Sequence, residues 1–178
     1  MDATGHPLLL RGHQVVLAPF QAADITEAYL GWLNDPAVVR FSNQRFLCHD
    51  RASSERYLAS FAGTTHQFFG IRRADNLQAI GTLTAYVAPH HGTVDAGILI
   101  GDRRVWGQGY GQDAWDTWLN WLIGRPDIRK VTAGTLACNL GMRRLMERSG
   151  MQLEAVRRAQ EIVEGRAEDL LYYARFRP

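Results

Sequence analysis

The chain has 178 residues, of which 46% are hydrophobic and 21% charged, and its formal net charge is +2. This length predicts a single domain over residues 1–178 without a separate substrate module. The composition excludes a disordered or fibrous protein, and the balanced charge excludes an electrostatic nucleic-acid binder of the ordinary type.

Cysteine usage indicates the cellular compartment, and the spacing of cysteine and histidine bears on metal binding. Cys48 and Cys138 are the only cysteines, and free thiols in a reducing cytoplasm explain them most simply. The apolar run at residues 7–10 is far too short for a signal-peptide core or a membrane span. No Cys-x-x-Cys or His-x-x-x-His pair supports a metal site. We therefore expect a cytoplasmic protein with no membrane partner and no bound metal.

The first half of the chain predicts a strand, two helices and two more strands. A short strand covers residues 15–17, and apolar side chains at helical spacing follow over residues 25–33. A weaker helix is expected over residues 54–61, and two strands over residues 67–72 and 80–87. The second of these strands alternates threonine and tyrosine with apolar residues, so one of its faces is polar.

Capping signals frame the first helix. Asp24 precedes the apolar pattern and Glu27 follows three residues later, which predicts a capping box. Residues 34–36, Asn-Asp-Pro, are expected to end the helix because proline cannot continue it.

The second half predicts strands over residues 94–100 and 130–136, a helix over residues 112–123, and a short helix from Asn139 to a glycine cap at Gly150. An antiparallel pair of strands, residues 152–163 and 169–176, completes the chain. The sequence thus predicts an α/β (α+β) fold in which about four helices flank a mixed, mostly antiparallel sheet of about seven strands.

A glycine-rich turn joins the strand at residues 94–100 to the following helix. Gly107, Gly109 and Gly111 allow close approach of the main chain, and Arg104 adds a cation at the rim. A strand, a glycine-rich loop and a helix in this order direct free N–H groups and the positive helix end at an anion. Phosphate is the expected guest.

Two common phosphate motifs do not fit this turn. A dinucleotide fingerprint needs glycine three residues after Gly109, where the chain has Gln112. A P-loop needs lysine followed by serine or threonine, but the only lysine is Lys130.

The remaining pattern, Arg104-x-x-Gly107-x-Gly109, resembles the pyrophosphate-binding signature Gln/Arg-x-x-Gly-x-Gly/Ala of the GNAT superfamily of acetyl-CoA-dependent N-acetyltransferases. Residues 106–111, Trp-Gly-Gln-Gly-Tyr-Gly, resemble its common Trp-Gly-Lys-Gly-Tyr-Gly/Ala version. The strand residues 97–101 resemble the strand that precedes the signature.

Features outside the turn agree with this resemblance. Asn139 with Gly150-Met151 resembles the later Asn…Gly-Phe element of the superfamily. Residues 32–36, Trp-Leu-Asn-Asp-Pro, resemble the branch that includes Rim-type protein N-terminal acetyltransferases and nucleotide-sugar amine acetyltransferases. The likeness covers residues 10–176.

The resemblance implies acetyl-CoA as the co-substrate. Loop amides would hold the coenzyme A pyrophosphate, main-chain groups of the preceding strand would line the pantetheine arm, and an asparagine would contact the arm from the opposite side. The implied residues are Ile98, Leu99, Ile100, Arg104, Val105, Trp106, Gly107, Gln108, Gly109, Tyr110, Gly111 and Asn139. In the family, the strands that correspond to residues 94–100 and 130–136 splay apart.

Acetyl transfer to an amine needs a base, because an alkyl amine with a pKa of about 10.4 is protonated at neutral pH. Asp95 stands where related enzymes often have glutamate. It is either a base, acting through water or after burial raises its pKa, or a solvated carboxylate at the strand end. The resemblance also implies that a backbone N–H near Leu99 polarises the thioester carbonyl.

Two positions depart from the family pattern. Met146 replaces a tyrosine that many members use as the acid toward the leaving thiolate, and Met142 replaces a serine of Rim-type members. No general acid is assigned to this helix.

The acceptor pocket is expected between the first helices and the polar face of the strand at residues 80–87. Its candidates are Trp32, Asn34, Asp35, Arg40, Phe41, Thr82, Thr84 and Tyr86. Taken singly, each of these residues is better explained as part of a capped helix end or an ordinary exposed strand face. The acceptor stays open among a small amine-bearing metabolite, an amino sugar nucleotide and a protein N-terminus. A polyamine is less favoured because Asp35 is the only obvious carboxylate.

The sequence therefore predicts an N-acetyltransferase in which the amine attacks the thioester directly. The alternative is an acyl-CoA-binding module without activity, which is suggested by Met146 in place of the tyrosine acid. Nucleic-acid binding by the arginines of the last third of the chain is not favoured, since Glu147 and Glu154 interrupt them. The final strands could also pair two copies into a homodimer.

Overall fold

The computed structural model describes residues 8–178. Its helices are α1 (Glu27–Asn34), α2 (Pro36–Val39), α3 (Arg51–Ala59), α4 (Tyr110–Gly124) and α5 (Leu140–Arg148). Its strands are β1 (Leu10–Arg11), β2 (Val15–Pro19), β3 (Gln67–Arg73), β4 (Ala79–Ala88), β5 (Thr93–Ile100), β6 (Lys130–Leu136), β7 (Gln152–Val163) and β8 (Arg166–Phe176). Single 3₁₀ turns lie at Ala22–Asp24, Asn43–Phe46 and Arg103–Val105.

The strands form one mixed sheet of eight strands in the order β1-β2-β3-β4-β5-β6-β8-β7. Every neighbouring pair is antiparallel except β5 and β6, which run parallel. The predicted fold class, a mixed and mostly antiparallel sheet flanked by helices, is confirmed. The structure adds one strand, β1, and one helix, α2, to the expected elements.

Helix α2 shows why the expected stop after α1 was incomplete. The Asp35 side chain accepts a hydrogen bond from the Ala37 N–H at 2.9 Å, which makes Asp35 the N-cap of a new helix. Pro36 occupies the first turn, where its missing N–H has no partner to lose. The same Asn-Asp-Pro run therefore ends one helix and begins the next.

The predicted capping box of Asp24 and Glu27 is wrong. Thr26 is the N-cap of α1, and its hydroxyl accepts from the Tyr29 N–H at 3.2 Å. Asp24 instead accepts from the Gln21 N–H at 2.8 Å and pairs with Arg72 of β3. The Asp24 carboxylate caps the 3₁₀ turn that precedes α1, so the helix starts two residues later than predicted.

Three other boundaries differ from the prediction. Helix α3 starts at Arg51, earlier than expected, because Asp50 and Ser53 form a reciprocal capping box with hydrogen bonds of 2.7 and 3.0 Å. Helix α4 starts at Tyr110 and strand β8 at Arg166, each earlier than its expected first residue.

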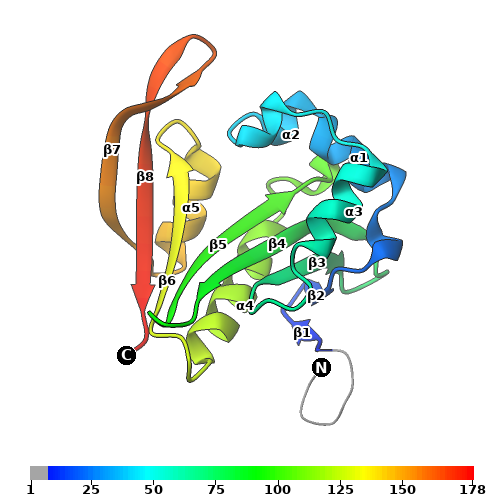
Figure 1. The fold of residues 1–178 in the computed structure, drawn as a ribbon, viewed down its shortest axis with the longest axis horizontal. Helices are drawn as coiled ribbons and strands as arrows, with labels where there is room; N and C mark the ends of the chain where they lie inside the picture. The colour runs from blue at the N-terminus through cyan, green and yellow to red at the C-terminus, as the bar shows by residue number, and fades with distance from the viewer. Residues whose placement is uncertain (1–7) are drawn as a thin grey trace.

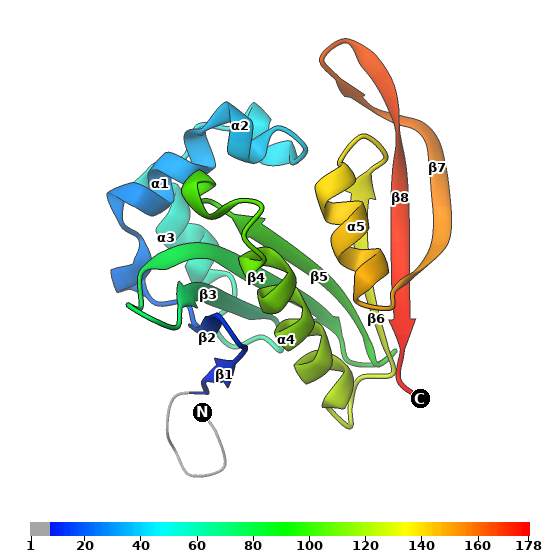
Figure 2. The same ribbon diagram turned by 180° about the vertical axis from the view of Figure 1, so that it is seen from behind.

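The helices cover both faces of the sheet (Figures 1 and 2). Helix α4 packs Trp115, Trp118 and Leu122 against one face, where all three are fully buried. A smaller cluster under α1 on the other face includes Tyr29 and Phe68. Strand β5 lies near the centre of the sheet, with helices over both of its faces.

Strands β5 and β6 separate part-way along their length. Their pairing runs only from Thr93↔Lys130 to Asp95↔Thr132, whereas β4 stays paired with β5 as far as Gly81↔Ile100. Figures 1 and 2 both show the two strands diverging beyond this point. Among residues 8–178, no strand pairs with the β6-facing edge of β5 from residue 96 to 100.

Candidate active site

The loop after β5 has the backbone of an anion-binding turn. Gly107 and Gly109 adopt left-handed conformations, with φ of 75° and 89°, that favour glycine over every other residue. Gly109 is the N-cap of α4 and offers no side chain to its first turn, so the amides of Tyr110 and Gly111 have no capping partner. A Cβ placed on Gly107 would meet no atom within 4 Å, so the surface there is open.

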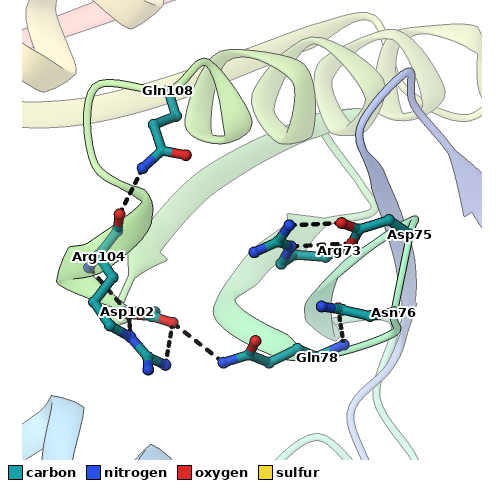
Figure 3. A network of polar contacts seen from close by, with 7 residues as sticks. All are labelled: Arg73, Asp75, Asn76, Gln78, Asp102, Arg104 and Gln108. Atoms are coloured by element: carbon teal, nitrogen blue, oxygen red, sulfur yellow. Dashed lines mark hydrogen bonds and ion pairs between the residues drawn. The ribbon is translucent and has the colours of Figure 1, made fainter.

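Asp102 holds this loop in shape (Figure 3). Its carboxylate accepts from the Arg104 N–H at 3.0 Å and from the Arg104 guanidinium at 2.9 and 2.8 Å. These hydrogen bonds keep the pKa of Asp102 below its ordinary value. The Gln108 side chain closes the loop by donating to the Arg104 carbonyl at 2.6 Å. The guanidinium of Arg104, expected as a cation at the rim of the turn, is therefore paired with Asp102.

The loop also folds back on the end of β5. The indole N–H of Trp106 donates to the Ile100 carbonyl at 2.9 Å, which fixes the loop beside the open strand edge. Trp32, a predicted acceptor residue, packs at the same corner, because a Cβ on Gly101 would overlap its indole ring. Ile98, Leu99 and Ile100 thus lead directly into the glycine turn, along the edge that β6 has left.

Helix α5 lies on the other side of the opening. Asn139 is its N-cap, and the side-chain oxygen accepts from the Met142 N–H at 3.2 Å. Met146 is completely buried in the core that α5 shares with α4. Residues 140–148 include no serine, threonine or tyrosine, so this helix offers no hydroxyl to act as an acid.

Asp95 stands where the two strands separate. It belongs to the last residue pair between β5 and β6, and the Thr132 hydroxyl of β6 donates to its carboxylate at 2.9 Å. In the β4–β5 ladder it lies opposite Tyr86, on the same face of the sheet. Its side chain keeps contact with solvent, but partial burial raises the pKa of the carboxyl above its ordinary value, against the opposing Thr132 hydrogen bond.

A first cavity of about 560 Å³ opens between the sheet and helices α1 and α3. Its floor includes Thr82, Thr84 and Tyr86 of β4, three of the candidates that the sequence offered for an acceptor pocket. Residues 97–99 of β5 also line it, so the cavity reaches the strand segment that has lost β6.

Part of the wall of this cavity comes from residues that the sequence did not single out for a site. His49, Ser54 and Tyr57 lie on or just before α3 and face the β4 residues across the cavity. The hydroxyl groups of Tyr57 and Tyr86 are hydrogen bonded at 2.6 Å, which ties α3 to the sheet. No spacing in the sequence relates these segments, because only packing of α3 on the sheet brings them together.

Most of the other predicted acceptor residues have structural partners. The Asn34 side chain exchanges hydrogen bonds with the His49 backbone at 2.7 and 2.9 Å, and so fixes the approach to α3. Asp35 caps α2 and pairs with Arg103 at 3.4 Å. Neither Asp35 nor Trp32 lines the first cavity.

Arg40 connects α2 to the tip of the β7–β8 hairpin. Its guanidinium lies over the Phe41 ring and forms two hydrogen bonds of 2.9 Å with Glu164. Asn34 and Arg40 line a second cavity of about 500 Å³ beside this contact. The first cavity therefore includes three of the predicted acceptor residues, Thr82, Thr84 and Tyr86, and the second includes Asn34 and Arg40. Neither cavity is lined by Trp32, Asp35 or Phe41.

Residues 8–178 contain neither a candidate membrane-spanning helix nor a candidate metal site. No helix there is both long and apolar enough to cross a bilayer. No group of three His, Cys, Asp or Glu side chains gathers there as a metal ion would require.

Comparison with known proteins identifies the family. A family model described as "Acetyltransferase (GNAT) domain" matches residues 14–152. No curated relative matches the sequence significantly. Among solved structures, an acetyltransferase of the GNAT family from Bacillus anthracis superposes with a TM-score of 0.80 at 16% identity, covering 96% of this chain and 99% of that one.

Two further structures contain coenzyme A. RimL, a ribosomal L7/L12 α-N-protein acetyltransferase, has a TM-score of 0.82 at 15% identity over 95% of this chain and 98% of its own. A spermidine N-acetyltransferase from Vibrio cholerae, bound to coenzyme A and spermine, has a TM-score of 0.83 at 14% identity over 92% and 96%. These likenesses agree with the fold, and the family model settles the assignment: the chain belongs to the GNAT family of acetyl-CoA-dependent N-acetyltransferases.

Proposed function

We propose that this chain moves the acetyl group of acetyl-CoA to a primary amine that attacks the thioester directly. One observation supports it above all: the unpaired edge of β5 runs straight into the free amides of the glycine turn. Strand residues 97–99 at that edge also line a cavity large enough for an acceptor. Donor and acceptor sites would thus meet at one strand.

The residues present fit coenzyme A. The loop amides from Val105 to Gly111 include those at the uncapped start of α4, which suits a pyrophosphate. Main-chain groups of residues 98–100 would pair with the amides of the pantetheine arm, as a neighbouring strand does. Asn139 would contact the arm from α5, and Arg104 would act by shaping the loop through Asp102.

Acetyl-CoA supplies the activated acyl carbon. The amine nitrogen forms a bond to that carbon, the carbon–sulfur bond breaks, and coenzyme A leaves as a thiolate that takes a proton from water. Asp95 accepts the proton of the amine through water, helped by its raised pKa. The Leu99 N–H stabilises the negative charge on the carbonyl oxygen.

The similar structures support an amine acceptor without fixing its class. Their names refer to a ribosomal protein N-terminus, to spermidine and to a microcin self-immunity acetyltransferase. For this chain, a small amine-bearing metabolite, an amino sugar nucleotide and a protein N-terminus fit the same reaction.

Release of free thiol from acetyl-CoA tests this function. We expect a mixed panel of primary amines to raise the rate above the rate of thioester hydrolysis, and calorimetry to detect binding of coenzyme A. Binding without amine-dependent release would favour the alternative, an acyl-CoA-binding module without activity. Absence of both binding and release would overturn the proposal.

A further inference from the structure

The first cavity has an uncharged wall. Among the described residues that line it there is no aspartate, glutamate, lysine or arginine. Outside the wall, Arg45 pairs with Glu161 at 3.4 Å and Arg40 with Glu164 at 2.9 Å. A second ammonium group buried against this wall would therefore lose its hydration without gaining a counter-ion from any wall residue.

Aromatic rings form much of this wall. Tyr29, Tyr57, Phe68 and Tyr86 all contribute, and Tyr57 meets Phe68 edge to face with their centroids 5.3 Å apart. Burial raises the pKa of Tyr29 to about 12 and raises that of Tyr57 as well, so both hydroxyls stay neutral at physiological pH. Such a wall favours a flat apolar guest, because aromatic rings pack best against rings.

Two polar atoms of the wall residues have no partner. Ser54 is 4% exposed, and its hydroxyl forms no hydrogen bond within the described chain. The Nε2 atom of His49 is buried and equally unpartnered, although Asn34 clamps the His49 backbone on both sides. Buried polar atoms are almost always hydrogen bonded, so a guest with a hydrogen-bonding group is the partner they lack.

We propose that the acceptor is a small primary monoamine whose uncharged aromatic body carries a hydroxyl or similar hydrogen-bonding group. The proposal rests on the acetyltransferase function given above. The ring lies among Tyr29, Tyr57 and Phe68, its polar group reaches the α3 wall at His49 and Ser54, and the amine points to Leu99. The amine nitrogen takes the acetyl group, and coenzyme A leaves as the thiol.

A panel of four acceptors at equal concentration tests the class: tyramine, phenethylamine, spermidine and a short peptide with a free N-terminus. We expect kcat/KM for tyramine to exceed that for spermidine and for the peptide by about a hundredfold or more, since a buried unpaired charge or unpaired amide is poorly tolerated. Spermidine or the peptide at or above the level of tyramine would overturn the acceptor class and leave the acetyltransferase function standing. No release with any amine would overturn the class as well, and coenzyme A calorimetry would then decide the function separately.

Two variants test the wall itself. Gln44→Glu places a carboxylate in the cavity wall, and Gln152→Glu adds the same charge to exposed β7 as a matched control. We expect only Gln44→Glu to raise kcat/KM for spermidine, by about tenfold, while it lowers that for tyramine. Equal effects of the two variants would contradict the proposal.

Ser54→Ala removes the unpartnered hydroxyl. We expect the KM for tyramine to rise about fivefold more than the KM for phenethylamine, because only tyramine carries the group that Ser54 would bind. A general loss of folding would change both constants alike. Equal changes in a variant that keeps its circular dichroism spectrum would show that Ser54 does not bind the acceptor.

Discussion

Strand β5 has two halves that differ in their neighbours. From Thr93 to Asp95 it is paired with β4 on one side and β6 on the other, and its backbone groups are satisfied by the sheet. From residue 96 to 100 only β4 remains, and the strand then enters a loop that ends at the uncapped amides of Tyr110 and Gly111. The first half is ordinary sheet interior. The second half has an unpaired edge, whose backbone groups are available to a ligand in place of a neighbouring strand.

The two proposed substrate sites, one for coenzyme A and one for the acceptor, are built differently. The proposed coenzyme site is made of main-chain groups, so it depends on backbone conformation and on missing strand pairing. The proposed acceptor cavity is lined largely by side chains, including those of α3 and β4, so it depends on their identity. Asp95 stands at the boundary between the halves of β5 and would serve both sites.

The largest effect is expected from closing the glycine turn. Gly109→Val places a branched side chain at φ 89°, with its Cβ 3.1 Å from Gln14 Nε2. Left-handed strain of about 1–2 kcal/mol, together with obstruction of the amides, should weaken coenzyme A binding about a hundredfold. Calorimetry measures this. Gly124→Ala, which meets nothing within 4 Å at the end of α4, is the control, and unchanged affinity in Gly109→Val would refute the main-chain site.

Removing the carboxylate at the boundary comes next. Asp95→Asn should lower kcat/KM about a hundredfold, as expected for loss of a general base. Because burial raises the pKa of Asp95, wild-type activity should fall on acidification at a higher pH than an ordinary aspartate would give, and the variant should lose this limb. The pH profile of kcat/KM measures both effects. Activity within twofold of wild type would leave Asp95 a solvated carboxylate, and Asp127→Asn in an exposed turn controls for charge.

A smaller effect is expected at the carboxylate that shapes the loop. Asp102→Asn should cost about 1 kcal/mol of unfolding free energy at neutral pH, discounted because Arg104 is 78% exposed. The hydrogen bonds from Arg104 lower the folded-state pKa of Asp102, so its stabilisation is complete above the unfolded pKa of about 3.9. It disappears as the pH falls through the lower folded pKa. Urea unfolding at pH 7 and in strong acid should therefore show a difference from wild type only at pH 7.

The smallest effects concern the ion pairs that join the segment around α2 to the tip of the β7–β8 hairpin. Arg45 and Glu161 are 14% and 22% exposed, and Arg45 also donates to the Ile162 carbonyl at 3.2 Å. Arg40 and Glu164 are 51% and 65% exposed. Thermal unfolding should show a loss of about 1 kcal/mol for Arg45→Ala and a smaller loss for the more exposed Arg40→Ala. The reverse order would mean that burial does not decide the strength of these pairs.

The sequence predicted the main-chain part of the site well. Glycines leave a direct trace in the sequence: Gly107 and Gly109 were expected to let the main chain approach closely, and both adopt left-handed conformations that favour glycine. The strand before the turn and the helix after it were placed nearly correctly because their apolar patterns are strong. The separation of β5 from β6 could not be predicted from the residues alone, since it is an absence of pairing with no residue of its own.

The side-chain part was predicted only in outline. Thr84 and Tyr86 were found because they alternate with core residues on β4, but His49, Ser54 and Tyr57 reach them through packing between distant segments. Competing local interactions explain the smaller errors. The Asp24 carboxylate caps a 3₁₀ turn instead of α1, and the Arg104 guanidinium pairs with Asp102.

Amide hydrogen exchange with and without coenzyme A is the sharpest test of the main-chain coenzyme site, because it reads both halves of β5 in one experiment. We expect the ligand to slow exchange in residues 96–100 and in the loop from Gly107 to Gly111, while residues 93–95 keep the protection that the sheet already gives them. Exchange that is unchanged in the second half of β5, or slowed only elsewhere in the molecule, would contradict it.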